Sequence, residues 1–382
     1  MSKKVLITGC SSGFGRLTAE TLRRRGHTVV AAMRDPQGRN KSAAEKLRAC
    51  GALVTEIDVS DDQSVARGAA WAIKEAGGLD VLVNNAGIGV CGVQETFTIE
   101  DWKKLFDINL FGAQRMARAV LPGMRKQGSG LLIHISSLLG RFVLPFFGPY
   151  NASKFALEAL AENYRVELSG FGIDSIVVEP GAYGTDFPNR LLYPSDLRRA
   201  GDLGSFADAP RKQMEGFSGH MTGPTAPKPQ RVADAIADLI ELPAGKRPFR
   251  TVVDDMGMGR HISACNQASE AAMQNIYEAF GMGEMLKTQD QDPRGGLALA
   301  GEGRGRGIDG GEGLVRGSHH GRDGDGSAHG LAHPLLRSDR PQPAHALHVR
   351  PQGVGLEIIL NLEGDDVPER VVGEIEPVVE HV

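Results

Sequence analysis

The sequence predicts an α/β protein with a doubly wound parallel sheet and helices on both of its faces. Short apolar segments of strand length alternate along the chain with longer segments that have helical spacing. These apolar segments are hydrophobic throughout rather than at every second position, as expected of strands that are covered on both faces. Parallel strands joined by right-handed crossovers then give the doubly wound arrangement.

The expected strands are rich in Val, Ile and Leu, and each is followed by a segment with helical periodicity. The strands read KVLIT (4–8), TVVAAM (28–33), LVTEID (53–58), DVLVNNA (80–86), GLLIHIS (130–136), DSIVVEP (174–180) and FRTVVD (249–254). The helices are expected at 15–25, 42–50, 62–76, 99–127, 151–170, 229–242 and 262–280. We assign residues 1–286 to one domain.

The composition changes at about residue 287, where Gly, Arg, Pro and His replace the apolar residues. Such a segment cannot bury a core, so residues 287–382 are expected to form a low-complexity, disordered tail. These residue types are the ones that GC-rich DNA encodes out of frame, and we hypothesise that the tail is a frameshift or read-through product. Its histidines lack cysteine or suitably spaced carboxylate partners, so no metal site is expected.

The overall composition is that of a soluble globular protein of 382 residues, with 41% hydrophobic and 24% charged residues. A net charge of −4 gives no reason to expect nucleic acid or an anionic membrane as a partner. The four cysteines form no C-x-x-C pair, which favours a reducing compartment. Because we find neither a signal peptide nor a membrane span, we expect a cytoplasmic location.

A glycine-rich turn follows the first strand, in the sequence ITGCSSGFGRLTAETL. Gly9, Gly13 and Gly15 allow the backbone to turn tightly and to approach a pyrophosphate at the positive end of the next helix. The position of this turn between a strand and a helix predicts nucleotide binding.

A second motif, YNASK, places Tyr150 and Lys154 one helical turn apart. An ammonium beside a phenol favours the phenolate, which would suit proton transfer. Alternatively, the two residues form an ordinary pair on the surface of an amphipathic helix.

Five motifs together, in this order, resemble those of the short-chain dehydrogenases/reductases, in their typical single-domain branch. They are Thr8–Gly15 (T-G-x-x-x-G-x-G), Asn84–Gly87 (NNAG), Ile135–Ser137 (ISS), YNASK, and Pro180–Gly181 (PG). The resemblance covers about residues 3–255. It implies an oxidoreductase that transfers a hydride between a nicotinamide cofactor and a secondary alcohol or ketone.

The resemblance implies a catalytic tetrad of Asn109, Ser137, Tyr150 and Lys154. Tyr150 would be the general acid/base, with its pKa lowered towards ~7 by Lys154 and by the oxidised nicotinamide. Ser137 would hydrogen-bond the reacting oxygen, and Asn109 would hold a water against the lysine.

Cofactor contacts are implied for a larger set of residues. This set comprises Gly9, Ser11, Ser12, Gly13, Phe14, Gly15, Arg34, Asp58, Val59, Asn85, Ala86, Gly87, Tyr150, Lys154, Pro180, Gly181 and Thr185. Asp58 could instead cap the end of its strand, and Thr185 could cap the turn that follows it.

The choice between NADP and NAD depends on the end of the second strand, which reads VVAAMRDP. Met33 stands where NAD-dependent members of the family carry aspartate, and Arg34 suits the 2′-phosphate of NADP. We therefore expect NADP(H). Asp35 leaves NAD open, because a shift of one residue would bring its carboxylate to the ribose.

The segment at about 182–228, here called the lid, is expected to cover the substrate. Its apolar residues predict a pocket for a lipophilic alcohol or ketone, although they could also pack against the domain or a second subunit. They are Tyr183, Phe187, Leu191, Leu192, Tyr193, Phe206, Met214, Phe217 and Met221. The resemblance also implies a homodimer or homotetramer formed through the helices at 99–127 and 151–170.

Two other functions on the same scaffold were considered. An NADP-binding regulatory protein without turnover would be expected to lack Tyr150 or Lys154. An epimerase or dehydratase would be expected to have a different glycine spacing and a larger substrate domain.

Overall fold

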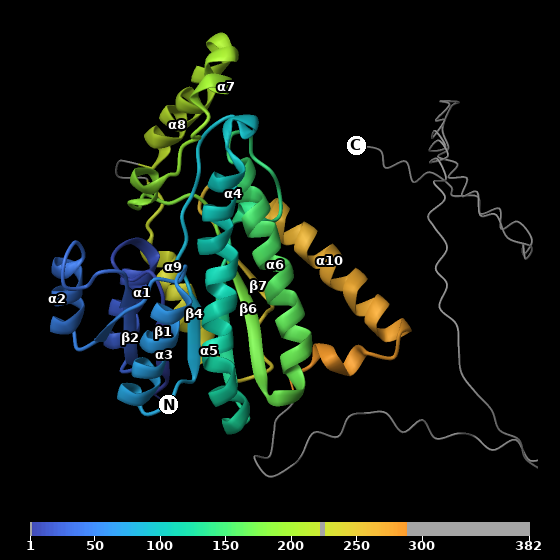
Figure 1. The fold of residues 1–382 in the computed structure, drawn as a ribbon. Helices are drawn as coiled ribbons and strands as arrows, with labels where there is room; N and C mark the ends of the chain where they lie inside the picture. The colour runs from blue at the N-terminus through green and yellow to red at the C-terminus, as the bar shows by residue number, and fades with distance from the viewer. Residues whose placement is uncertain (1, 222–225, 289–382) are drawn as a thin grey trace, which may run out of the picture. The chain divides into compact units, whose positions relative to one another are not determined.

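The computed structural model describes residues 2–221 and 226–288, and its centre is a seven-stranded parallel sheet (Figure 1). The strand order is β3-β2-β1-β4-β5-β6-β7, which confirms the predicted doubly wound fold. The strands are β1 (Lys4–Ile7), β2 (Thr28–Met33), β3 (Leu53–Glu56), β4 (Val81–Asn84), β5 (Gly130–Ile135), β6 (Ile173–Pro180) and β7 (Arg250–Val253). All of them lie at the expected places in the sequence.

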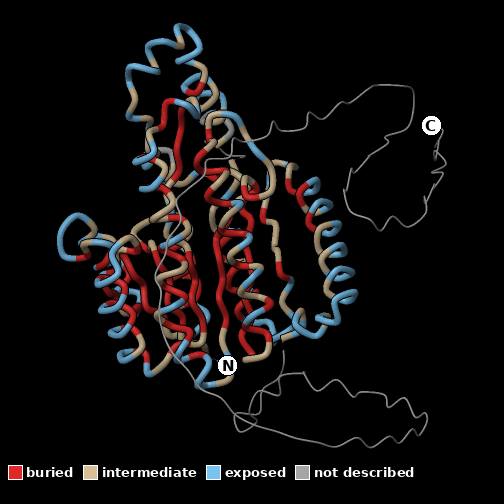
Figure 2. The backbone as a smooth tube through the Cα atoms, turned by 45° about the vertical axis from the view of Figure 1, so that its right-hand side comes forward, coloured by how far each residue is buried: buried red, intermediate tan, exposed pale blue. Residues whose placement is uncertain are grey.

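Helices cover both faces of the sheet. One face packs on α1 (Gly13–Arg24), α2 (Lys41–Ala49) and α9 (Gln230–Glu241). The other face packs mainly on α3 (Asp62–Ala76) and α5 (Gly112–Gln127), and α6 (Gly148–Leu168) lies against β6. Figure 2 shows the result, with buried strands between partly exposed helices. This double cover explains why the strand sequences are apolar on both faces.

Two helices differ from their expected bounds in ways that affect the candidate site. The expected helix at 99–127 is divided into α4 (Ile99–Phe106), a π-helical turn (Asp107–Phe111) and α5. Single π-helical turns often occur at functional sites, and this one buries Asn109. Helix α6 begins at Gly148, with Pro149 in its first turn, which also places Tyr150 at the start of the helix.

The lid has more regular structure than its sequence predicts. It contains two short 3-10 helices, η5 (Phe187–Arg190) and η6 (Gly204–Asp208), and two α-helices, α7 (Leu197–Asp202) and α8 (Ala209–His220). Figure 1 shows α7 and α8 above the carboxyl ends of the strands. Their sequences are too short or too mixed in polarity for a clear helical period.

The described chain ends with α10 (Gly259–Ala279) beside β7 and a last short turn, η7 (Gly283–Leu286). No helix within residues 2–221 and 226–288 is long and apolar enough to span a bilayer. Apart from Lys287 and Thr288, the predicted tail lies outside the described residues.

Candidate active site

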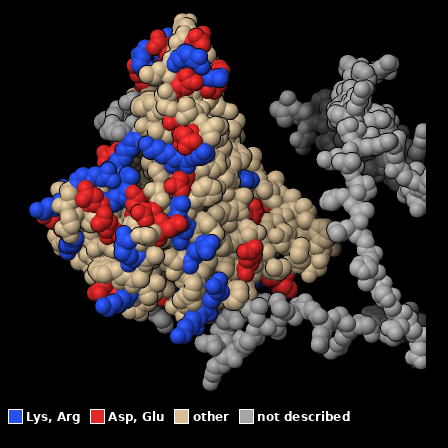
Figure 3. Space-filling view, viewed as in Figure 1, with Lys and Arg blue, Asp and Glu red and all other residues tan. Residues whose placement is uncertain are grey.

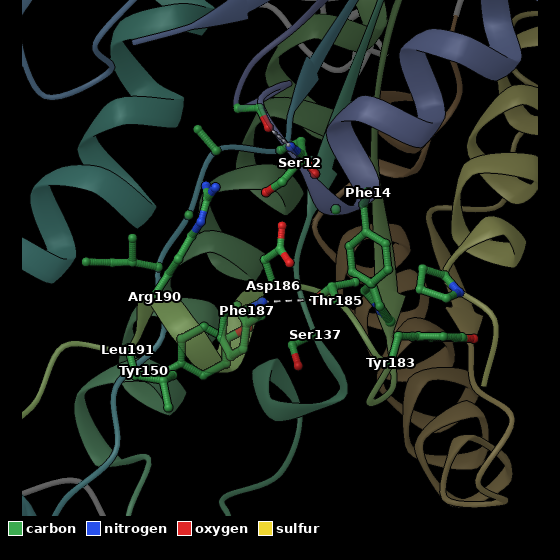
Figure 4. A pocket seen from close by; sticks show the side chains of 18 of the residues that line it. Ser12, Phe14, Ser137, Tyr150, Tyr183, Thr185, Asp186, Phe187, Arg190 and Leu191 are labelled. Atoms are coloured by element: carbon green, nitrogen blue, oxygen red, sulfur yellow. Dashed lines mark hydrogen bonds between the residues drawn. The ribbon is translucent and has the colours of Figure 1, made fainter. Parts of the chain in front are cut away.

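A cavity of about 1240 Å³ lies at the carboxyl ends of the strands, where the order of the sheet reverses between β1 and β4 (Figure 4). Ligands of open α/β sheets bind at such a reversal point. Of the residues expected in the site, those that line the cavity are Gly9, Ser11, Ser12, Gly13, Phe14, Arg34, Asp58, Val59, Asn85, Ala86, Gly87, Ser137, Tyr150, Pro180, Gly181 and Thr185. Gly15, Asn109 and Lys154 do not line it, and their contacts are described below.

The turn between β1 and α1 is shaped to admit a phosphate group. Gly9 and Gly13 have φ angles of 72° and 56°, a region that favours glycine. A side chain at Gly15 would come 2.7 Å from the Gly9 carbonyl oxygen and closer still to the Asn85 amide, so the turn is packed against the end of β4. The first turn of α1 contains no acidic residue, which leaves its positive end open to an anion. These features fit the pyrophosphate of a dinucleotide.

Basic side chains predominate around the cavity. It is lined by Arg16, Arg34, Arg39, Lys104 and Arg190, against only two acidic residues, Asp58 and Asp186. Figure 3 shows a band of Lys and Arg side chains between α2 and the base of the lid. The cavity therefore favours an anionic ligand.

The Asp35 side chain points into the loop that follows β2. Its φ of 47° turns the chain, and its carboxylate accepts hydrogen bonds of 2.9 Å from the backbone amides of Gly38 and Arg39. Asp35 is thus bound to its own loop and does not line the cavity, whereas Arg34 and Arg39 do. The sequence interpretation missed Arg39. The only available signal was its position five residues after Arg34.

Asp58 and Thr185 each line the cavity, and each also forms a local hydrogen bond of the kind expected if it is a capping residue rather than a cofactor contact. The Asp58 carboxylate accepts from the amide and the hydroxyl of Ser60, at 3.0 and 2.7 Å. Burial raises the pKa of Asp58, but these hydrogen bonds and the charges of Arg34 and Arg39 outweigh burial, and the net pKa is lowered. The Thr185 hydroxyl accepts from the Phe187 amide at 3.2 Å.

Three of the four residues of the expected tetrad meet at the end of β5 and the start of α6. Tyr150 is 8% exposed, and the Ser137 side chain lies near enough to its phenol to lower the phenol's pKa. Lys154 donates a 2.7 Å hydrogen bond from Nζ to the Ile135 carbonyl, and Nζ lies 5.6 Å from the centre of the Tyr150 ring. Phenol, hydroxyl and ammonium are therefore close together in a buried environment.

The pKa of Tyr150 differs from the expectation. Burial raises the pKa of the phenol to about 12, and the Ser137 side chain opposes this only in part. The expected lowering of this pKa by Lys154 is wrong for the protein chain without a cofactor, because desolvation of the phenol dominates. Burial also lowers the pKa of Lys154 to about 8, although the nearby charge of Glu158 raises it.

Asn109 lies behind the cavity wall, in the π-helical turn. Its side-chain amide donates to the Ile88 carbonyl at 2.9 Å and to the Ser153 hydroxyl at 3.0 Å, and its oxygen accepts from the Ile88 amide at 2.9 Å. It therefore joins the segment after β4 to α6. The side chain is only 2% exposed, which supports the alternative of a buried structural hydrogen bond as well as a role near Lys154.

Apolar residues also line the cavity. From the lid these are Tyr183, Phe187, Leu191, Leu192, Met214, Phe217 and Met221. Tyr193 and Phe206 were expected there, but they do not line it and are 61% and 53% exposed. The sequence interpretation missed Leu138, Leu139, Phe142, Leu144 and Phe147, although these apolar residues directly follow Ser137 and precede α6.

The described part of the chain contains no group of three or more His, Cys, Asp or Glu side chains that could hold a metal ion.

Several known proteins are similar to this chain in sequence and in fold. A family model described as short chain dehydrogenase matches residues 3–192. The chain is 40% identical over 183 residues to 3-ketodihydrosphingosine reductase of Bacteroides thetaiotaomicron, and the match covers 48% of the chain and 65% of that protein. It is also 40% identical over 195 residues to human retinol dehydrogenase 8, and this match covers 50% of the chain and 62% of that protein. The chain thus matches just under two thirds of the length of these relatives.

Among solved structures, a short-chain dehydrogenase from Streptomyces avermitilis is similar, with a TM-score of 0.59 and 30% identity. The match covers 74% of this chain and 98% of that one, so it extends through the lid and beyond the family model. Together with the phosphate-binding turn and the arrangement of Ser137, Tyr150 and Lys154, these matches show that the chain belongs to the short-chain dehydrogenase/reductase family.

Proposed function

We propose that the protein transfers a hydride between NADP(H) and a lipophilic secondary alcohol or ketone, with Tyr150 as the general acid/base. One observation carries this proposal: a single cavity joins the phosphate-binding turn, two arginines at the end of β2, the Ser137–Tyr150 pair and an apolar wall. Residues 1–286 would form the catalytic domain. Association of copies through α5 and α6 stays a prediction.

Each residue of the site would have a distinct role in the transfer of the hydride and the proton. The nicotinamide ring, when bound, supplies or accepts the hydride. The Ser137 hydroxyl would donate a hydrogen bond to the substrate oxygen and hold it beside the Tyr150 phenol. In reduction, Tyr150 would give its proton to that oxygen, and in oxidation it would take the proton away. The Lys154 ammonium, near Gly87 and under the Tyr150 ring, would stabilise the phenolate that remains after reduction.

The preference for NADP(H) is supported by Arg34 and Arg39. A guanidinium pairs well with a phosphate, and the nearest acidic competitor, Asp58, lies 4.0 Å from Arg34 and is already hydrogen-bonded to Ser60. Each of the variants Arg34→Gln and Arg39→Gln should weaken NADPH binding on the order of 10-fold. Neither should change NADH binding more than about twofold, because NADH lacks the 2′-phosphate. Lys41→Gln, on the exposed surface of α2, is the matched control. Equal losses for NADPH and NADH would contradict the assignment.

The substrate class is supported by the apolar wall. One relative is named for the reduction of 3-ketodihydrosphingosine and another for retinol, which are both lipophilic, and this cavity has room and apolar lining for a lipophilic substrate. The test is consumption of NADPH with a panel of ketones of increasing chain length, in wild type and Tyr150→Phe. We expect activity to rise with chain length and to fall by at least ~100-fold in the variant. No turnover with any ketone or alcohol, or full activity in the variant, would overturn the proposal.

A further inference from the structure

One short segment of the lid reaches both ends of the candidate active site. The 3-10 helix η5 carries Phe187 at its start and Arg190 at its end. The Phe187 ring packs edge-on against Tyr150, with ring centres 5.7 Å apart. The Arg190 guanidinium donates a 3.4 Å hydrogen bond to the Ser11 hydroxyl in the phosphate-binding turn. Figure 4 shows both side chains extending from this segment into the cavity.

The segment is capped locally before its start and is held to the body of the domain by hydrogen bonds after its end. Before it, the Thr185 hydroxyl accepts from the Phe187 amide. After it, the Leu192 amide donates to the Gly89 carbonyl at 2.9 Å, and the Leu192 carbonyl accepts from the Cys91 amide at 3.2 Å. Further along, the buried Asp101 carboxylate accepts from the hydroxyl of Ser195 at 2.7 Å. The backbone at Arg190 is therefore placed by the fold rather than by its own side chain.

The charge of Arg190 is not balanced by a carboxylate. Among the described residues it forms no ion pair within 4.0 Å, whereas Arg16 pairs with Glu20 and Arg34 with Asp58. Its partner, the Ser11 hydroxyl, is neutral, and the 3.4 Å distance is long for a hydrogen bond. The one acidic side chain of the lid that lines the cavity, Asp186, lies between Ser12 and Phe187 in Figure 4.

We propose that Arg190 binds the pyrophosphate of the dinucleotide from the lid side. The anion would then lie between the backbone amides of Ser11–Gly13 and the guanidinium, which can donate two parallel hydrogen bonds to phosphate oxygens. Because Phe187 belongs to the same segment, this contact would hold its ring against Tyr150 when the cofactor is bound. Arg190 is thus a positioning residue. The proposal rests on the proposed dinucleotide site, but it does not depend on the substrate or on turnover.

Calorimetric measurement of the affinities for four nucleotides distinguishes contact with the pyrophosphate from contact with the 2′-phosphate. NADPH, NADH and ADP-ribose all contain a pyrophosphate, whereas adenosine 2′-monophosphate has none. Arg190→Met should weaken the binding of NADPH, NADH and ADP-ribose alike, by on the order of 10-fold to 100-fold. It should change the affinity for adenosine 2′-monophosphate by less than about twofold. Arg190→Lys should have an intermediate affinity for these three nucleotides, because lysine keeps the positive charge but cannot donate two parallel hydrogen bonds. Arg39→Gln should give the opposite pattern, with losses for NADPH and adenosine 2′-monophosphate only.

Limited trypsin digestion tests the connection to the lid. The lid contains cleavage sites at Arg198, Arg199, Arg211 and Lys212, and cleavage is followed at these four because Arg190→Met removes the site at Arg190. ADP-ribose should slow cleavage there in wild type but not in Arg190→Met, at concentrations that saturate both proteins. Unchanged affinity for ADP-ribose in Arg190→Met, or equal protection of both proteins, would overturn the proposal. Failure of wild type to bind NADPH or NADH would instead overturn the proposed function.

Discussion

Tyr150 should remain protonated throughout the neutral range until a dinucleotide binds. Burial raises its pKa to about 12, and the Ser137 side chain opposes this only in part. Lowering that pKa from about 12 to ~7 would require roughly 7 kcal/mol of preferential stabilisation of the phenolate. An exposed phenol, with a pKa of ~10, would need only about 4 kcal/mol. Folding alone therefore moves Tyr150 away from the pKa that proton transfer needs.

The assay is the ultraviolet absorption of phenolate, titrated between pH ~6 and ~10, in wild type and Tyr150→Phe. Without nucleotide the two titrations should superimpose. With saturating NADP⁺, wild type should gain a phenolate component that the variant lacks, because the positive nicotinamide ring favours the charged form. A component near pH ~7 that is present without nucleotide and lost in Tyr150→Phe would refute the reasoning.

Stability gives an independent check of the same pKa. A group whose folded-state pKa is raised contributes stability that is fully present below its unfolded pKa and is lost as pH rises through the folded one. For Tyr150 this window runs from ~10 to about 12. Wild type and Tyr150→Phe should therefore show the same pH dependence of the free energy of unfolding at every pH below ~10. A divergence of the two curves near neutral pH would contradict the raised pKa.

Two further substitutions test the packing behind the site. Gly15→Ala would place a methyl group 2.7 Å from the Gly9 carbonyl oxygen, so we expect NADPH binding to weaken by on the order of 10-fold. Gly123→Ala, in α5 with open space around it, should leave the affinity unchanged, and equal affinities in the two variants would contradict the close packing of the turn. Arg250→Met should lower the free energy of unfolding in urea by roughly 3–5 kcal/mol, because it leaves the buried carboxylates of Glu158 and Glu179 without their cation. Arg231→Met removes an arginine that is 60% exposed and should lower the free energy of unfolding by less than ~1 kcal/mol. Similar losses in Arg250→Met and Arg231→Met would contradict a stabilising role for the buried ion pairs of Arg250.

The sequence predicted the strands, most of the helices and the positions of the phosphate-binding turn and the Tyr150–Lys154 pair. These features depend on local patterns: uniform apolarity in a covered strand, the i, i+4 spacing of a helix and a glycine-rich turn between the two. The assignment of Ser137 also needed only its place at the end of a strand, together with the family resemblance. The fold class follows because each of these segments is consistent with the next.

Only the tertiary structure determined where several side chains point and what surrounds them. Asp35 turns into its own loop, Arg39 reaches the cavity from a separate turn, and Arg190 meets Ser11 across 179 positions of the chain. The pKa of Tyr150 rises although Lys154 is near, because desolvation depends on everything packed around the phenol. The position of the lid likewise depends on contacts such as those of Leu192 with Gly89 and Cys91. Local periodicity contains no information on such long-range contacts or on burial, and these decide the electrostatics of the site.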